Sequence, residues 1–403
     1  MLKDTEDFFV SKKEWSEIKD DLLACYLTPY FSKVLNTRKT INYIDCFAGK
    51  GKFDDGKFGS PIIALNIISN CIRHNHSVSC PIVNTYFVEK HYAEELQENL
   101  KDYKNAKVIK GAYQDNIRNI LKSKTNENVF LYIDPFGIKC LLFDLYDFYS
   151  QANFSSIELL INFNFFGFIR EACRVKKVES IYISELDIIV KLFGGIDGDI
   201  KSEQELNCIA GGDYWEKIIE DYKLGKITCY EAEKRISEQY CNKLKEKFKY
   251  VVNMPIRLKS GKQPKYRMIH ATNNEEGCIL MVQNICNRWE SLLAIQTKNL
   301  ERSLFDENVE NDIIDDESTE NIILNHLKQY STPVRMNIFL ANLFTSKGVF
   351  TKWDILQKSL RNLESCKRIT LRRSPSITKT GKKSTFINES PKEKHLVEIW
   401  INR

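Results

Sequence analysis

Short apolar runs alternate with stretches of helical spacing through the first 300 residues of the chain. Continuous apolar runs predict buried strands over residues 41–47, 82–88, 108–109, 129–133 and 157–163. Between them, apolar side chains recur at helical spacing, as at Ile117, Ile120 and Leu121. Strands that alternate with helices form βαβ units and a mainly parallel sheet. The pattern therefore predicts an α/β fold with a Rossmann-like, doubly wound sheet covered by helices on both faces.

The pattern changes twice before residue 300. Residues 174–250 are charged and helical in character, and we expect them to form an insertion in the first domain. Two further strands, 250–258 and 266–271, are expected to close the sheet. A helix over 276–300 is expected to end the domain. We therefore assign residues 1–300 to one Rossmann-like domain.

The last 85 residues have a pattern of their own. Apolar side chains predict three helices, and residues 369–372 and 384–387 are expected to pair as a hairpin. Three helices followed by a hairpin are typical of a winged-helix-like α+β domain, which we assign to residues 319–403. Residues 301–318 carry 8 acidic residues and 1 basic residue, and they predict an acidic linker.

Composition excludes some classes of protein. The chain has 403 residues, of which 43% are hydrophobic, and contains no run of about 20 apolar residues that would span a bilayer. Its first 20 residues lack the apolar core of a signal peptide, so we expect a cytoplasmic protein. The 12 cysteines include no CxxC pair of the kind that metal sites favour. We expect them to be reduced thiols and predict no metal site.

The most informative segment follows the first predicted strand. Asp45-Cys46-Phe47-Ala48-Gly49-Lys50-Gly51 places an acid and two glycines where the strand ends. Glycines at such a turn let a ligand approach the backbone closely. The segment lacks the third glycine of a dinucleotide fingerprint and the Lys-Ser/Thr end of a P-loop. We therefore expect this turn to contact a nucleotide-type cofactor but not to bind phosphate groups. We also expect Ser60 to be the N-cap of the next helix.

Further polar residues follow the other predicted strands. Glu89 ends the second strand, where an acid can accept hydrogen bonds from ribose hydroxyls, and Asp115 follows the third, where adenine is often bound. Asp134-Pro135-Phe136-Gly137 ends the fourth strand. There Asp134 can accept a hydrogen bond from an exocyclic amine, and Phe136 can stack on a base. Asn162 and Asn164, at the end of the fifth strand (162–166), are candidates for lining the substrate pocket.

These segments together resemble the three-Cys-motif partner protein (TcmP) family. The likeness rests on residues 43–51, 59–61, 87–89, 133–137, 160–163 and 270–273, in that order along residues 10–300. The resemblance implies a methyltransferase-like fold with S-adenosylmethionine as cofactor, and it implies a three-Cys-motif protein as a partner. The glycine turn is also similar to that of a bacterial ribosomal-RNA adenine-N6 methyltransferase family. The chain departs from the amino-methyltransferase pattern Asp-Pro-Pro-Tyr/Phe, because Phe136 replaces the second proline and Gly137 replaces the aromatic residue.

The candidate site residues fall into three sets. The cofactor set is Asp45, Phe47, Ala48, Gly49, Gly51, Ser60, Glu89 and Asp115. The set facing the methyl acceptor is Asp134, Pro135, Phe136 and Gly137. The nucleic-acid set comes from a basic loop and the basic tail, in which a net charge of +10 over residues 319–403 favours phosphate contact. It is Lys259, Lys262, Lys265, Arg372, Arg373, Lys382 and Lys383.

Three hypotheses about function stay open at this point. The first is an S-adenosylmethionine-dependent methyltransferase acting on a nucleic-acid base, which would flip out of a duplex to react. The second is a non-catalytic, nucleic-acid-binding partner subunit of a radical-SAM-type enzyme, which the altered 134–137 segment favours. The third is a Mg²⁺-dependent nuclease, if the acids at the four strand ends converge on one ion.

Overall fold

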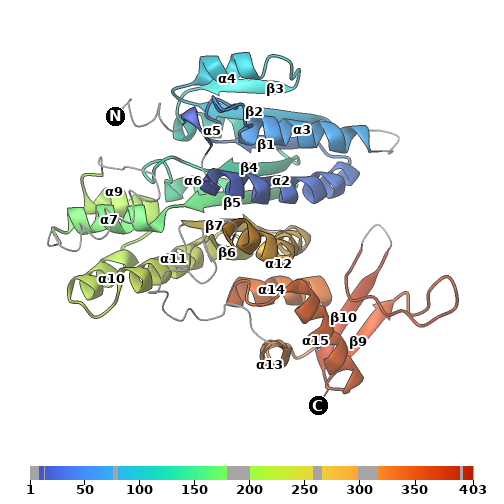
Figure 1. The fold of residues 1–403 in the computed structure, drawn as a ribbon. Coiled ribbons are helices and arrows are strands. Elements are labelled where there is room, and N and C mark those ends of the chain that lie inside the picture. Colours follow the sequence, from blue (N-terminus) through green and yellow to red (C-terminus); the bar gives the residue numbers. More distant parts are fainter. Residues whose placement is uncertain are drawn as a thin grey trace. The chain divides into compact units, whose positions relative to one another are not determined.

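The computed structural model describes residues 9–12, 14–75, 80–178, 200–256, 266–297, 316–390 and 394–402. They form two compact units that divide between Asn274 and Glu275. Figure 1 shows the elements of both units.

The first unit is built on a sheet of seven strands in the order β3-β2-β1-β4-β5-β7-β6. The strands are β1 (Ile41–Asp45), β2 (Val83–Glu89), β3 (Ala106–Lys110), β4 (Asn128–Ile133), β5 (Ser156–Phe163), β6 (Tyr250–Ile256) and β7 (Tyr266–Thr272). Neighbouring strands among β1 to β5 pair in parallel, whereas β7 pairs antiparallel with both β5 and β6. This mostly parallel sheet confirms the prediction of a Rossmann-like α/β fold.

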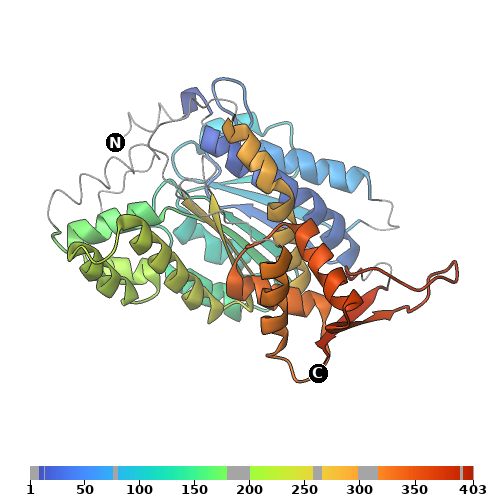
Figure 2. The same cartoon turned by 60° about the horizontal axis from the view of Figure 1, so that its bottom comes forward.

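Ten helices of the described residues accompany this sheet. They are α2 (Glu14–Val34), the 3-10 helix η1 (Leu35–Thr37), α3 (Ser60–Arg73), α4 (Ala93–Asn99), α5 (Tyr113–Leu121), α6 (Phe143–Gln151), α7 (Phe165–Val175), α9 (Glu203–Ala210), α10 (Tyr214–Lys223) and α11 (Cys229–Lys245). The last three are the helical part of the expected insertion, whose residues 179–199 lie outside the described residues. Figure 2 shows α7 and these three helices grouped on one side of the unit.

The central strands are buried on both faces. Every residue of β1 and β4 is buried, as expected for parallel strands that helices cover on both sides. On one face the rings of Tyr43 and Phe130 stack 5.8 Å apart, and Phe130 also meets Tyr26 of α2. The next residues along the strands, Ile44 and Leu131, face the opposite way and join the core formed with α5, α6 and α7. The carboxyl ends of the strands are thereby held in place from both sides.

The fifth strand ends at Phe163, as the sequence predicted, and α7 begins at Phe165. Residues 165 and 166, which the prediction grouped with the end of the strand, therefore belong to a helix. The reason is Asn164, whose side-chain oxygen accepts a hydrogen bond from the Gly167 N–H at 2.9 Å and caps the helix. Asn164 thus has a structural role in place of the expected pocket-lining role.

Within its described residues, the second unit contains four helices and a small antiparallel sheet. The helices are α12 (Glu275–Thr297), α13 (Asp316–Leu327), α14 (Met336–Lys347) and α15 (Trp353–Ser365). The strands β8 (Val334–Arg335), β9 (Ile369–Ser374) and β10 (Leu396–Ile401) form a sheet in the order β8-β10-β9. Of the expected linker, residues 301–315 lie outside the described residues, and α13 begins at Asp316.

Two expectations for this part of the chain differ from the structure. The strand that pairs with β9 is β10, not residues 384–387. Residues 396–401 pair with β9 because they bury the side chains of Val397 and Ile399 on the inner face of the strand. Helix α12, expected to end the first domain, instead packs in the second unit, where the Cys286 thiol donates to the Thr351 carbonyl at 3.3 Å. None of the described helices has the length and hydrophobicity that a membrane span requires.

Candidate cofactor and acceptor site

Three parallel strands of the first unit end side by side at the candidate site. β1 ends at Asp45, β2 at Glu89 and β4 at Ile133, one residue before Asp134. β1 lies between the other two and pairs with both. The carboxyl ends of parallel strands are where ligands bind in open α/β sheets. The topology therefore brings three of the predicted acids to one edge.

Asp45 is a buried carboxylate whose described partners are neutral. Its side chain is 0% exposed, and it accepts hydrogen bonds from the Ser60 hydroxyl at 2.6 Å and from the Phe47 N–H at 3.2 Å. No ion pair to Asp45 occurs among the described residues. Burial raises its pKa to about 7, and the charges of Asp134 and Asp20 add to this effect. When it is ionised, Asp45 is thus a buried negative charge without a cationic partner among the described residues.

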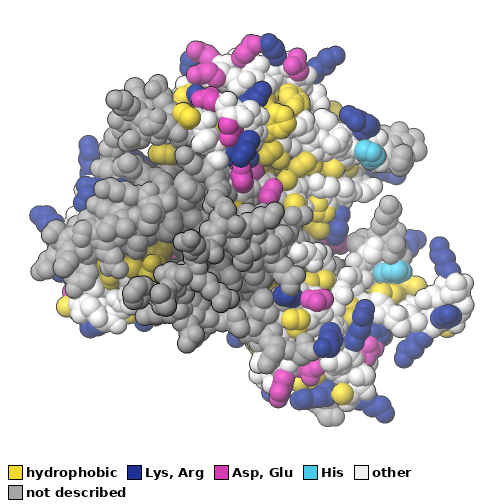
Figure 3. Space-filling model, viewed as in Figure 1, with side chains coloured by type: hydrophobic (Ala, Val, Ile, Leu, Met, Phe, Trp, Pro, Cys, Tyr) yellow, Lys and Arg dark blue, Asp and Glu magenta, His cyan; other side chains and the backbone are white. Residues whose placement is uncertain are grey.

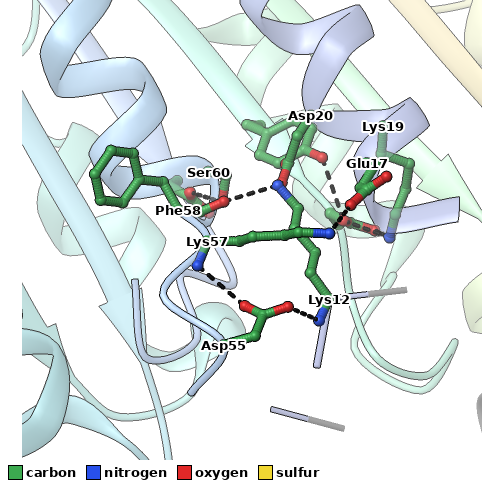
Figure 4. Close-up of polar contacts among 11 residues, drawn as sticks. Lys12, Glu17, Lys19, Asp20, Asp55, Lys57, Phe58 and Ser60 are labelled. Carbon is green, nitrogen blue, oxygen red and sulfur yellow. Dashed lines mark hydrogen bonds and ion pairs between the residues drawn. The ribbon is translucent and has the colours of Figure 1, made fainter. Parts of the chain in front are cut away.

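The Ser60 hydroxyl explains a difference from the prediction. We expected Ser60 to be the N-cap of its helix, but the N-cap of α3 is Gly59 and Ser60 is the first helical residue. The hydroxyl donates to Asp45 instead. Figure 4 shows Ser60 directly after the loop that carries Asp55, Lys57 and Phe58. The helix start thereby fixes the orientation of the carboxylate.

Glu89 ties the glycine turn to the second strand. One of its oxygens accepts from the Gly49 N–H at 2.8 Å, and the other accepts from the N–H groups of His91 at 2.7 Å and Tyr92 at 3.1 Å. A carboxylate has about four acceptor positions, so about one remains for a ribose hydroxyl. Glu89 therefore shapes the turn as well as offering an acceptor.

The two glycines adopt backbone conformations that other residues rarely accept. Gly49 has φ of 60° and Gly51 has φ of 74°. A Cβ on Gly49 would lie 3.1 Å from ring atoms of Phe9, and one on Gly51 would lie 2.9 Å from a methyl carbon of Leu96. Both positions thus favour glycine, because of their backbone conformation and because Phe9 and Leu96 leave no room for a Cβ. Phe9, which lies before the first long helix, covers the turn.

Asp134 stands at the centre of a hydrogen-bond network. Its two oxygens both accept from the Lys19 ammonium, at 2.8 and 2.7 Å. Asn162 donates to one oxygen at 2.6 Å, and the Tyr132 hydroxyl donates to the other at 3.2 Å. The side chains of Lys19 and Asp134 are 14% and 17% exposed. The carboxylate is therefore oriented by three donors and lies close to the surface of the unit.

The N-terminal segment, residues 12–20, supplies groups that the motifs did not reveal. Lys12 forms an ion pair with Asp20 at 2.6 Å and donates to the Phe58 carbonyl at 2.7 Å (Figure 4). Burial raises the pKa of Asp20 to about 6, against the opposing effect of Lys12. A signal for this was present in the sequence, because Ser16 and Asp20 continue the apolar stripe of α2 with buried polar side chains.

The remaining predicted residues of the first unit lie around this edge. Phe47 packs against Tyr113 with ring centroids 5.2 Å apart, and the Ala48 N–H donates to the Val88 carbonyl at 3.0 Å. Asp115 is exposed on the first turn of α5. Pro135 and Gly137 are partly buried, whereas Phe136 is 49% exposed, as a ring that stacks on a ligand would be. The contacts of the described residues do not link Asp115 to the other acids.

The basic residues of the second unit differ in what they can bind. Arg373 is buried and donates to both oxygens of Glu364, at 2.6 and 2.7 Å. Arg372 is exposed and pairs with Glu398. Lys382 and Lys383 are exposed in the loop between β9 and β10 and form no ion pair within the described residues. Figure 3 shows several Lys and Arg side chains on the visible face of this unit.

Three predicted cations, Lys259, Lys262 and Lys265, lie outside the described residues. Within the described residues, no group of three or more His, Cys, Asp or Glu side chains is placed to hold a metal ion. The 12 cysteines all lie within the described residues, and none of them forms a disulfide.

Comparisons with known proteins add little to this geometry. No family model matches the chain, and no curated protein matches it. Among solved structures, the chain has a weak likeness to an Escherichia coli protein named "Putative methyltransferase yhhF". The two share 16% identity over 38% of this chain and 71% of that chain, with a TM-score of 0.26. At this level the likeness carries no argument about activity.

Proposed function

We propose that the first unit binds S-adenosylmethionine at the carboxyl edge of β1 and transfers its methyl group to an amino group of a nucleic-acid base. The observation that carries this proposal is the state of Asp45. It is a fully buried carboxylate with neutral partners only among the described residues, and it lies beside the glycine turn that follows β1. The sheet order, with β7 inserted antiparallel between β5 and β6, supports the class I methyltransferase fold as the finer assignment.

The charge at Asp45 selects among cofactors. A buried carboxylate without a cation repels phosphate groups and attracts an ammonium group. S-adenosylmethionine carries an ammonium and a sulfonium, whereas dinucleotides bring phosphates. Two acceptor positions of Asp45 remain after Ser60 and Phe47 have donated. Asp45 would hold the ammonium there, directly or through water, and Glu89 would accept from the ribose.

The acceptor side of the proposal rests on Asp134. When bound, S-adenosylmethionine would supply an electrophilic methyl group to an acceptor nitrogen, with the carbon–sulfur electron pair staying on sulfur and the proton of the nitrogen passing to water. Asp134 would accept a hydrogen bond from the amino group and keep the nitrogen lone pair directed at the methyl carbon. Exposed Phe136 would stack on the base.

Calorimetric titration with S-adenosylmethionine tests the cofactor assignment. We expect micromolar binding by the wild type and a loss of at least tenfold in affinity for Asp45→Asn, which removes the charge and keeps the shape. Asp102→Asn is the matched control, because Asp102 is exposed just beyond α4. If the wild type does not bind at millimolar cofactor, or if both variants bind as well as the wild type, the proposal fails.

We also propose that the second unit contacts nucleic acid through exposed cations of its basic loop. Its element order, α13-β8-α14-α15-β9-β10, supports the winged-helix-like assignment, and Arg372, Lys382 and Lys383 are exposed. Removing a lysine that neutralises a phosphate lowers the slope of log affinity against log salt by about 1. We expect Lys382→Ala and Lys383→Ala each to do so with a labelled oligonucleotide, and Lys328→Ala, beyond α13, to leave the slope unchanged. Equal slopes in all variants would refute this interface.

The family assignment is part of the same proposal. The ordered motifs over residues 10–300 favour the three-Cys-motif partner protein family and, with it, a partner protein that carries the cysteines. Co-purification with such a partner, followed by cofactor titration of the complex, tests both. We do not propose a nuclease, since the four acids supply no metal cluster among the described residues.

A further inference from the structure

The carboxylate of Asp134 is saturated with hydrogen-bond donors. Lys19 donates to both oxygens, and Asn162 and Tyr132 donate to one oxygen each. These four hydrogen bonds match the roughly four acceptor positions that a carboxylate offers. A further donor, such as the amino group of a methyl acceptor, can bind Asp134 only if one of the present donors leaves.

The three donors differ in how easily they can leave. Tyr132 lies on β4 and Asn162 on β5, and both side chains are buried on central strands of the sheet. Lys19 lies on α2, and its ammonium ends a flexible four-carbon side chain that is 14% exposed. A rotamer change withdraws the ammonium without moving the backbone. Of the three donors, Lys19 is the one that can be exchanged.

A second observation points to a ligand at the same place. The side-chain oxygen of Asn162 is buried and has no donor among the described residues, although its NH₂ group donates to Asp134. This orientation of the amide is fixed, because the reverse one would place two acceptors together. A buried acceptor without a donor is costly unless a ligand or water supplies one. An amino group has two N–H bonds, which suits one acceptor on Asp134 and one on Asn162.

We infer that Lys19 occupies the position of the acceptor's amino group and acts as an internal competitor, which the acceptor must displace from Asp134. This inference rests on the proposed function and deepens it. An ammonium that donates to a carboxylate at 2.7–2.8 Å has the same donor geometry as the amino group of a base. A base without an exocyclic amino group cannot donate to Asp134 and Asn162 together, so it does not replace the hydrogen bonds of the displaced lysine. Lys19 is therefore a specificity-determining residue that favours amino acceptors.

The surroundings keep Lys19 in this place when no acceptor is bound. Lys12 holds the start of the segment through Asp20 and the Phe58 carbonyl, and the Lys12 N–H donates to Asp55 at 3.0 Å. Glu17 forms an ion pair with Lys57 (Figure 4). The loop that makes these contacts, residues 52–59, leads directly into Ser60 at the cofactor edge. The internal competitor and the cofactor pocket thus share one supporting loop.

Binding of two oligonucleotides tests the inference. One is a labelled single strand of adenine and cytosine, and the other has the same length with hypoxanthine and uracil, which lack exocyclic amino groups. Affinities are measured by fluorescence anisotropy with saturating S-adenosylhomocysteine. We expect Lys19→Met to bind the amino-bearing strand about tenfold more tightly than the wild type, since no charged hydrogen bond must be broken. The affinity for the strand without amino groups should not increase in Lys19→Met, because the loss of a cation weakens contact with the phosphates.

Controls separate this effect from a general change in charge. Lys19→Gln keeps an N–H donor without the charge. Its affinity for the amino-bearing strand is expected to lie between those of the wild type and Lys19→Met. Lys33→Met, at the other end of α2, should leave the preference between strands unchanged. In an Asp134→Asn background, Lys19→Met should no longer raise the preference. A Lys19→Met preference equal to that of the wild type, while both strands still bind, overturns the inference and leaves the proposed function standing. Loss of cofactor or oligonucleotide binding by the wild type overturns both.

Discussion

From the raised pKa of Asp45 we predict how the stability of the first unit depends on pH, and this prediction can be tested without knowing the substrate. In the folded protein, burial raises the pKa of this carboxyl from 3.8 to about 7. The folded state therefore binds a proton in a pH range in which the unfolded chain has released it. The contribution of Asp45 to stability is consequently largest below pH 3.8 and is lost as the pH rises through about 7. Asp45→Asn removes this titration and keeps the size of the side chain.

The magnitude follows from the two pKa values. Between pH 8 and pH 5, protonation of Asp45 stabilises the folded wild type by about 3 kcal/mol, whereas an asparagine contributes no such change. The stability difference between variant and wild type should thus shift by about 3 kcal/mol over this range, with the variant favoured at pH 8. Any effect of the amide on packing is the same at both pH values and cancels. Asp20, whose pKa is also raised, titrates in both proteins.

Differential scanning calorimetry measures how the difference in Tm between variant and wild type changes from pH 5 to pH 8. It suits this purpose because it can resolve the transitions of the two units. For a unit of this size, about 3 kcal/mol corresponds to a shift on the order of 8 °C in Tm. Asp102→Asn should follow the wild type at both pH values. If the Tm difference between Asp45→Asn and the wild type is the same at pH 5 and pH 8, Asp45 is not an uncompensated buried charge. The reasoning that assigns a cationic ligand to it would then be refuted.

Two further predictions concern the turn and the second unit. Gly51→Ala should destabilise the first unit by about 1–3 kcal/mol in urea unfolding, because φ is 74° and the new Cβ meets Leu96 at 2.9 Å; an unchanged midpoint would contradict the strained turn. Arg373→Met should lower the free energy of unfolding of the second unit by about 2 kcal/mol, and with it the Tm, because Glu364 loses its partner. The matched change Arg372→Met, at an exposed pair, should alter stability by less than about 1 kcal/mol, and similar losses for both would show that burial does not matter here.

The fold of the first unit was predictable from local patterns. Buried parallel strands appear as continuous apolar runs, so β1, β4 and β5 stood out in the sequence and were predicted to within a few residues. The acids were placed correctly at the ends of strands for the same reason. What the pattern could not supply was the partner of each acid. Ser60 was recognised as the start of a helix, but its hydroxyl faces Asp45, which depends on how α3 packs beside β1.

The prediction failed where a tertiary contact decides between two local alternatives. Residues 384–387 and 396–401 both suit a strand, and only the burial of Val397 and Ile399 selects the second. Lys19 was not predicted as a site residue, because it lies 115 positions from Asp134 and on a helix. Residues that form a long-range ion pair have no characteristic spacing in the sequence, so the pair cannot be predicted from it. The polar positions on the inner stripe of α2 were the only indication in the sequence that this helix contributes to the site.

The charges at the carboxyl edge explain why the two proposals belong together. Asp20 pairs there with Lys12 and Asp134 with Lys19, whereas Asp45 and Glu89 accept hydrogen bonds from neutral donors only within the described part of the chain. Of the latter two, Asp45 is fully buried, and a cationic cofactor beside it would compensate its charge. At Asp134 the charge is already balanced by Lys19, so an acceptor gains entry only by displacing the ammonium. Cofactor binding should therefore depend on the pH near 7 and on salt through Asp45, whereas discrimination between amino and non-amino acceptors should depend on Lys19.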